Sequence, residues 1–348
     1  MLRVLLLCLG VALNSISLAQ SNAPAPITSE QLDFYLLQAF HASFASERIA
    51  LNHIGLQTQQ QGEDFVISAV LEGYPAHRAG ISRGDIIRAV NGAPYQPVQS
   101  FNPHDAGPPF VDSEAEYSLV LERGGDTLTV TVSPVFENLY DSARTATINS
   151  VQQFSAGNKV IGYIRLWALA RTSNDLITFD KLIDQLAHCD GLIVDLRDAY
   201  GFLSSQHLDK FLPNRLRRIE LQGNGSVHTQ LAAESPSLVQ RSYQKPIAVL
   251  INSKTRGGAE LLALQLAKMD RVLTLGESTP GRIGDWQLLD SNGSKSIIYL
   301  PADDSLIENR QFEGVGVIPQ QAVAYPVEQT TRNDPQFEAA FNALMGRI

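Results

Sequence analysis

The chain has 348 residues, of which 44% are hydrophobic and 18% charged, which is typical of a globular protein large enough for two domains. Its net charge of -9 and the lack of a basic stripe argue against a nucleic-acid partner, because phosphate binding requires clustered cations. The His residues lack metal-ligand spacing, so neither a metal nor another cofactor is expected.

Residues 1–19 have the pattern of a secretory signal peptide. Arg3 supplies a positive start, Val4–Leu13 is an apolar run too short to span a bilayer, and Ser17–Ala19 is a small-x-small cleavage site. We therefore expect an exported protein, periplasmic or extracellular, with no stable membrane insertion after cleavage. A retained membrane anchor is the alternative.

Residues 20–50 are predicted to be a linker followed by a helix. Asn22–Ile27 is rich in Pro and Ala, and Thr28–Gln31 has the pattern of a capping box. Apolar residues then follow at helical spacing to about residue 48: Leu32, Tyr35, Leu36, Phe40 and Phe44. This apolar face should pack on the rest of the protein.

Residues 51–135 are predicted to form a compact β-rich unit. Phe65–Val70 is a strand candidate, and Tyr117–Glu122 and Thr127–Val132 are joined by Arg-Gly-Gly-Asp, which is a hairpin signal. Residues 100–116 are interpreted as an insertion to which the sequence assigns no role.

Residues 74–92 read Tyr-Pro-Ala-His-Arg-Ala-Gly-Ile-Ser-Arg-Gly-Asp-Ile-Ile-Arg-Ala-Val-Asn-Gly. The Pro-Ala, Ala-Gly-Ile, Gly-Asp and Val-Asn-Gly elements resemble a PDZ domain in order and spacing. His53, Ile54, Gly55 and Leu56 then stand where PDZ domains keep their carboxylate-binding loop. The resemblance implies that protein or peptide C-termini are the partners, bound as an added strand beside the loop. A β-sandwich with a plain hairpin turn is the alternative.

From residue 136 to residue 348, predicted strands alternate with helices, which is typical of an α/β domain. Strands are expected at 160–166, 191–196, 247–251, 272–275 and 297–300, and together they should form one sheet of at least five strands. Helices are expected around 179–186, at 260–268 and after Asp334, which should cap the last helix ahead of Pro335.

The mature chain resembles the C-terminal processing, or tail-specific, serine peptidases, because several of its motifs occur in that family's order. The motifs lie at residues 162–165, 191–197, 245–260, 275–281, 313–319 and 334–336. Each motif is weak alone, whereas their common order is a strong signal. The resemblance implies an α/β fold with a crotonase-like peptidase core at 136–348, preceded by the helical segment and the PDZ domain.

Active members of the family use a serine nucleophile and a lysine base, and this chain has neither at the matching positions. Aligned on Glu260, the serine falls on Gly257 in both subgroups of the family. The lysine falls on Ala259 in one subgroup and on Arg282 in the other. An arginine side chain keeps its proton at any working pH, so Arg282 cannot act as the base.

Thr255, two residues before Gly257, is a candidate substitute nucleophile. The alternative is that its hydroxyl stabilises the turn. The resemblance places the oxyanion donors on the backbone of Gly258 and in the loop at Gly201 and Phe202. Phe202 departs from the second glycine of the family's loop, which leaves the second donor open.

Asp195, Arg197 and Asp198 follow a predicted buried strand. They could support catalysis, but a structural ion pair that fixes the loop is the preferred interpretation.

The sequence thus predicts an exported PDZ-containing protein with a serine peptidase fold that binds peptide C-termini and has lost catalysis. Two alternatives remain open. One is an active serine-type endopeptidase with displaced catalytic groups, and the other is an assembly scaffold.

Overall fold

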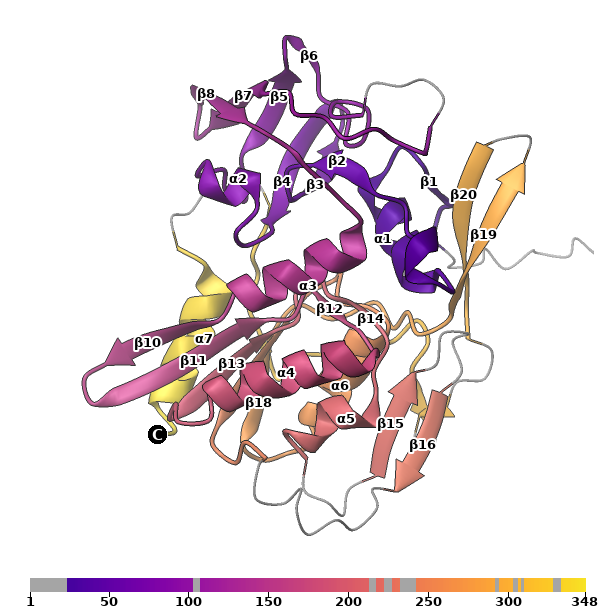
Figure 1. Ribbon diagram of the computed structural model, residues 1–348. Coiled ribbons are helices and arrows are strands. Elements are labelled where there is room, and N and C mark those ends of the chain that lie inside the picture. The colour runs from indigo at the N-terminus through magenta and orange to yellow at the C-terminus, as the bar shows by residue number, and fades with distance from the viewer. Residues whose placement is uncertain are drawn as a thin grey trace, which may run out of the picture.

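The computed structural model of the chain describes residues 24–102, 107–212, 217–221, 227–231, 242–291, 294–302, 306–307, 310–327 and 333–348. The predicted signal peptide lies outside these residues. Figure 1 shows a small β-rich unit above a larger α/β unit, with helix α1 (Leu32–His41) at their junction. None of the described helices is long and apolar enough to cross a membrane.

The smaller unit is an antiparallel sheet with the strand order β3-β4-β5-β7-β8, to which β6 adds on β5. Its strands are β3 (Leu56–Gln61), β4 (Asp64–Val70), β5 (Ile86–Val90), β6 (Ala93–Pro94), β7 (Tyr117–Arg123) and β8 (Asp126–Val132). The predicted strand at 65–70 and hairpin at 117–132 are confirmed. Among the described strands β3 pairs with β4 alone, so its other edge can accept a further strand.

The larger unit is built on a sheet with the order β10-β11-β13-β17-β18-β23. Its strands are β10 (Gln152–Ala156), β11 (Lys159–Arg165), β13 (Gly191–Asp195), β17 (Ile247–Ile251), β18 (Val272–Gly276) and β23 (Gln321–Ala322). β11, β13, β17 and β18 are parallel neighbours and read as apolar runs, because both faces of such a sheet are covered. They lie where four of the five core strands are predicted.

Helices cover both faces of this sheet. The largest apolar cluster joins one face to α4 (Ser173–Gln185), α5 (Ser205–Asp209) and α6 (Gly258–Leu266), whereas α7 (Pro335–Met345) packs on the other face. The Asp334 carboxylate accepts from the amides of Gln336 and Phe337, each at 3.0 Å, which confirms the predicted cap. The β17–α6 turn lies at the carboxyl end of the parallel strands, where α/β sheets bind ligands.

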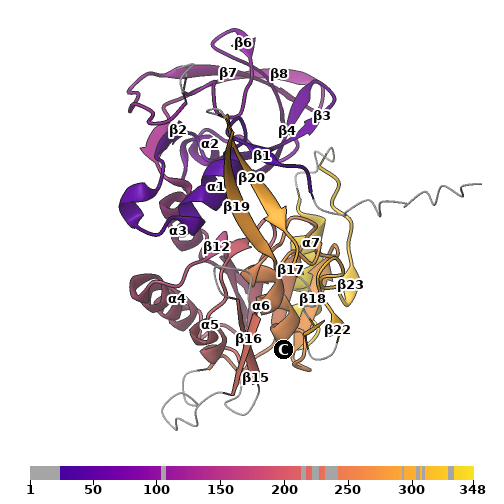
Figure 2. The ribbon, with the colours of Figure 1, turned by 90° about the vertical axis from the view of Figure 1, so that its right-hand side faces the viewer.

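The strand predicted at 297–300 is present but belongs to another sheet, so its assignment to the core sheet is wrong. β20 (Ser294–Leu300) pairs with β19 (Asp285–Ser291) and β1 (Ile27–Thr28) in a separate three-stranded sheet. Figure 2 shows this hairpin rising from the core beside α1. The outer core strand is β23 instead. A strand's own pattern shows which faces are buried but not which strand lies beside it.

Helix α1 is shorter than the helix predicted from residue 28 to about residue 48. Thr28 lies in β1 and pairs with β20, so the helix begins only after Gln31. The Gln31 side chain still accepts from the Thr28 amide at 3.0 Å, which is half of the predicted capping box. Phe44, predicted on the apolar face, lies beyond the helix end and is 68% exposed.

Helix α3 (Leu139–Asn149) connects the two units. The Ser142 hydroxyl of α3 hydrogen bonds to the buried imidazole of His53 at 3.0 Å. Glu72 of the smaller unit accepts from the indole N–H of Trp167 in the larger unit at 2.5 Å. Buried polar contacts of this kind require a specific geometry on both sides, so they fix the orientation of the smaller unit on the core.

The insertion at 100–116 packs between β2 (Leu51–His53) and α1. Asn102 Oδ1 accepts from the amide of Asn52 at 2.8 Å, and the Phe110 ring lies 5.7 Å from that of Tyr35. Residues 103–106 of the insertion lie outside the described residues.

The remaining short elements are η1 (Ala45–Glu47), α2 (Pro75–Arg78), β9 (Val135–Glu137), β12 (Ala168–Leu169), β14 (Tyr200–Gly201), β15 (Arg217–Leu221), β16 (Val227–Leu231), β21 (Leu306–Ile307) and β22 (Arg310–Gln311).

Candidate active site

The turn between β17 and α6 holds Gly257, the position predicted to match the lost nucleophile. Gly257 is the N-cap of α6, with φ of +62° and ψ of -132°, a conformation that L side chains rarely adopt. In α/β-hydrolases a sharp strand-to-helix turn of this kind exposes the nucleophilic serine above the sheet. In this chain the turn has the shape, but the residue at its apex carries no side chain.

The space above Gly257 is taken by its neighbours. A Cβ on Gly257 would lie 3.1 Å from the carbonyl oxygen of Gly201 and 3.3 Å from Cε2 of Tyr200. Tyr200 itself is only 2% exposed, so its ring is held in that place by packing. A serine at this position would therefore be in tight contact with the Gly201 carbonyl and the Tyr200 ring.

Helix α1 covers this turn through two polar contacts. The Tyr200 hydroxyl hydrogen bonds to His41 Nε2 at 2.7 Å. Arg256, next to the turn's apex, donates to the Asp33 carboxylate at 2.8 Å, and its guanidinium lies 5.2 Å from the centroid of the Tyr200 ring. The helix thus closes the turn from the solvent.

The structure engages one of the three predicted oxyanion donors. The Phe202 amide donates to the Leu169 carbonyl at 2.8 Å, and the Phe202 ring packs 5.3 Å from His41 of α1. Gly201 directs its carbonyl oxygen at the turn, 2.7 Å from the place of a Cβ on Gly258. A carbonyl oxygen repels developing negative charge, whereas an oxyanion hole requires donors. The Gly258 amide is not used by α6, because Gly258 is the first residue of the helix.

The structure also contradicts the prediction of Thr255 as a substitute nucleophile. Its side chain is fully buried, and its hydroxyl donates to the Leu196 carbonyl at 2.8 Å. The same oxygen accepts from the Asn252 amide at 3.0 Å. The hydroxyl therefore stabilises the turn, which is the alternative that the sequence offered.

The two predicted base positions differ in their surroundings. The Gly257 amide donates to the Arg282 carbonyl at 2.9 Å, so Arg282 lies directly beside the turn. The Glu260 carboxylate holds this loop by accepting from the amides of Gly281 at 2.5 Å and Arg282 at 2.7 Å. Ala259, in contrast, is fully buried in the largest apolar cluster. A lysine at Ala259 would bury its ammonium among apolar side chains, so the structure favours the subgroup with its base at Arg282.

Asp195, Arg197 and Asp198 form a buried ionic network, which confirms the structural interpretation. Arg197 donates to both oxygens of Asp195 and contacts the Asp334 carboxylate at 2.7 Å. Asp198 accepts from Arg165 at 2.9 Å. Burial alone would raise the pKa of Asp195, but Arg197 and Arg165 hold it below its usual value.

The family model of Peptidase family S41 matches residues 160–323, and that of the PDZ domain matches residues 66–101. The chain contains an S41 peptidase domain and a PDZ domain. It is 27% identical over 321 residues to a carboxyl-terminal-processing protease of Synechocystis sp., covering 86% of this chain and 69% of that protein. It is 26% identical over 237 residues to the carboxy-terminal processing protease CtpA of Bacillus subtilis, covering 66% and 47%.

Solved structures agree with the fold. A crystal structure described as an S41 protease, from Bacteroides fragilis, has a TM-score of 0.57 at 16% identity, covering 85% of this chain and 83% of that one. Apart from the Synechocystis protein, the chain spans about half the length of the curated relatives it matches. The crotonase-like character of the S41 core stays a prediction.

The loop at residues 53–56, predicted to bind a carboxylate, leads into β3, and one of its amides is engaged. Gly55 has φ of +78°, and a Cβ there would lie 2.4 Å from that of Tyr74, so only glycine fits. Its amide donates to His53 Nδ1 at 3.2 Å. Burial lowers the pKa of His53 to about 4, which keeps the imidazole neutral. The side chains of Ile54 and Leu56 belong to the PDZ core, and Leu56 also lines a cavity beside the loop.

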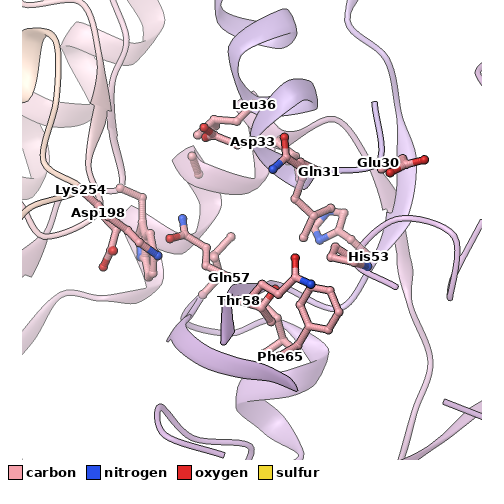
Figure 3. A pocket seen from close by; sticks show the side chains of 18 of the residues that line it. Glu30, Gln31, Asp33, Leu36, His53, Gln57, Thr58, Phe65, Asp198 and Lys254 are labelled. Carbon is pink, nitrogen blue, oxygen red and sulfur yellow. The ribbon is translucent and has the colours of Figure 1, made fainter. Parts of the chain in front are cut away.

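A cavity of about 530 Å³ lies where the PDZ loop, strand β3, the segment before α1 and the β17–α6 turn meet. Figure 3 shows His53 and Lys254 on opposite sides of it, with Gln57 and Thr58 of β3 between them. Its apolar lining is Leu36, Leu56, Phe65, Leu71, Leu139 and Trp167. Gly257 and Gly258 are not part of the lining, so the cavity ends short of the nucleophile position.

Sequence reasoning missed two walls of this cavity. The sequence assigned no binding role to Ser253 and Lys254, whereas the structure places both residues in the cavity wall. It also treated residues before α1 as a linker and helix cap, although Thr28 and Glu30 line the cavity. No local pattern carries such information, because these walls are assembled from distant segments. Among the described residues, no group of three or more His, Cys, Asp or Glu side chains could hold a metal ion.

Proposed function

We propose that this protein is an exported relative of the C-terminal processing peptidases that binds peptide C-termini and does not hydrolyse them. One observation carries the proposal: the apex of the strand-to-helix turn is Gly257, which offers no nucleophile. Removing the serine of a hydrolase costs on the order of a million-fold in rate. That loss corresponds to about 8 kcal/mol of activation free energy.

The surroundings of the turn support the same proposal. The Gly201 carbonyl oxygen and the Tyr200 ring would lie 3.1 and 3.3 Å from a Cβ on Gly257, so both crowd the nucleophile position. Arg282, at the favoured base position, has a guanidinium that keeps its proton. These losses act as one unit, so they are not additive, but each alone would impair acyl transfer.

Peptide binding is supported by the PDZ domain and by the cavity beside it. PDZ domains bind an extended peptide by adding it to a sheet edge, and β3 has such an edge facing the cavity. The cavity also has apolar walls and several polar side chains, which is typical of ligand sites. Export is supported by the pattern of residues 1–19.

A fluorophosphonate probe tests the loss of catalysis, because it labels only an activated hydroxyl. We expect the full chain to remain unlabelled and to leave an unfolded protein with an apolar C-terminus uncut. Ser253 is an exposed hydroxyl in the wall of the cavity, so Ser253→Ala is the matched variant. Labelling or cleavage that disappears in Ser253→Ala would overturn the proposal and establish a displaced nucleophile. Thr255→Val should change neither readout.

A further inference from the structure

Two cationic side chains of the cavity lining, Lys254 and Arg282, have no carboxylate partner among the residues that the structure describes. Lys254 donates to the neutral hydroxyl of Ser68 at 3.0 Å. The Arg282 side chain makes no hydrogen bond or ion pair within the described ranges. Both are half-buried, and both come from the S41 domain: Lys254 from the β17–α6 turn and Arg282 from the loop beside it. A partly buried cation without an anion is costly, so the site favours an anionic ligand.

The acidic residues of the cavity do not neutralise these cations. Asp33 is paired with Arg256 at 2.8 Å, and Asp198 with Arg165 at 2.9 Å. Glu30 is exposed and lies at the opposite side of the cavity in Figure 3. The cavity is therefore positive next to the β17–α6 turn and negative at its other side.

Strand β3 connects the two sides of the cavity. Ser68, which Lys254 contacts, is the residue at the β-bulge where the pairing shifts between Gln57 and Thr58. Lys254 therefore contacts β4 at the level of Gln57 and Thr58, near the start of β3, and lines the same cavity as these two residues. A peptide that adds antiparallel to β3 ends at this point, so its terminal carboxylate would arrive next to Lys254.

We propose that the S41 domain, through Lys254 and Arg282, binds the terminal carboxylate of the peptide that the PDZ domain holds. The PDZ loop contributes less, because the Gly55 amide donates to His53. The last side chain of the peptide is apolar and packs against the apolar lining of the cavity, and a basic residue further back would meet Glu30. This inference rests on the proposed function and names the groups of that site that select a free C-terminus.

Fluorescence polarisation with the full chain tests this assignment. The probes are a labelled decapeptide ending in three apolar residues with a free carboxylate, and the same peptide ending in an amide. We expect the wild type to bind the carboxylate about 10- to 100-fold more tightly, which is the value of a hydrogen bond to a charged group. In the double variant Lys254→Gln, Arg282→Gln this ratio should fall close to one, with the affinity for the amide unchanged.

The double variant Lys181→Gln, Arg347→Gln is the matched control, since both side chains are exposed outside the cavity and the change in net charge is the same. It should keep the full ratio. A ratio near one in the wild type would contradict the proposed function itself. A large ratio that persists in Lys254→Gln, Arg282→Gln overturns only this inference and assigns the carboxylate to the PDZ loop. If the double variant does not fold, the single variant Arg282→Gln replaces it, because this side chain loses no hydrogen bond or ion pair to the described residues. Its ratio should fall below that of the wild type, and an unchanged ratio would exclude Arg282 from the site.

Discussion

At the residue scale, two separate effects exclude a side chain from Gly257. The positive φ of +62° is costly for any residue with a Cβ. The Gly201 carbonyl and the Tyr200 ring would also touch that Cβ, at 3.1 and 3.3 Å. Gly62 has the same φ but no neighbour within 4 Å of its Cβ position. Gly62 therefore serves as a reference for a glycine with positive φ and no crowding.

We predict that Gly257→Ala lowers the free energy of unfolding by about 2–3 kcal/mol, because strain and overpacking add. Gly62→Ala, the control, should cost about 1 kcal/mol, because its site combines a positive φ with open space. Urea unfolding of both variants and the wild type gives the comparison. Equal decreases in the free energy of unfolding for the two variants would show that the space above the turn is open.

At the element scale, α1 acts as a cover that is fixed at both ends. Its first turn holds Asp33 against Arg256, and its last residue, His41, binds the Tyr200 hydroxyl. Strand β1 fixes the approach to the helix by pairing with β20. The cover and the turn below it are therefore one packed assembly.

We predict that Asp33→Asn lowers the free energy of unfolding by about 1–2 kcal/mol and speeds hydrogen exchange of the α1 amides. The reason is that Arg256, with a side chain 14% exposed, loses its anionic partner, while the exposure of Asp33 at 35% moderates the loss. Glu30→Gln, a change of the same charge at an exposed position, should cost less than about 0.5 kcal/mol. Unchanged exchange in Asp33→Asn would mean that the ion pair does not hold the helix.

Several secondary-structure elements could be predicted from local sequence patterns. The strand at 247–251 and the cap at Asp334 could be predicted, because their signals are contained in a few adjacent residues. The sheet to which residues 294–300 belong could not, since it depends on pairing with β1, far away in the chain. For the same reason the position of Gly257 could be predicted from motif order, whereas its closure by Tyr200 and α1 could not.

At the scale of the whole molecule, His53 ties the PDZ domain to the S41 domain. Its ring stacks on Tyr74, accepts from the Gly55 amide and hydrogen bonds to Ser142 of α3. Because burial lowers the pKa of His53 to about 4, the connection depends on a neutral imidazole. Acid should therefore weaken the junction between the domains.

The direction of the pH effect on stability follows from the lowered pKa of His53. The unfolded chain protonates His53 near pH 6.5, whereas the folded chain does so only near its pKa of about 4. The stability contributed by the neutral ring is present above about pH 6.5 and is lost as the pH falls toward 4, by about 2 kcal/mol at pH 5. We predict that His53→Gln, which cannot titrate, loses about 2 kcal/mol less than the wild type between pH 7 and pH 5 in urea unfolding.

His77→Gln is the control for this measurement, because His77 is exposed on the same domain. It should follow the wild-type pH dependence. Burial also lowers the pKa of His207 to about 4 and raises that of Glu260 to about 7. Both groups are present in the wild type and in the two variants, so their contributions to the pH dependence of stability cancel when the three are compared. If the free energy of unfolding changed with pH in the same way for His53→Gln and the wild type, the assignment of a neutral, buried His53 would be contradicted.

The pairing of Ile27 with Ile297 has a consequence for biosynthesis. A nascent chain leaves the ribosome with β1 first, but β1 has no partner until β20 has been translated. Until then the segment that includes Thr28 and Glu30 cannot settle against the cavity, even if the PDZ sheet has already formed. The protein should therefore gain its capacity to hold a ligand only once residues 294–300 can pair with β1, which protects it from premature capture of neighbouring chain ends.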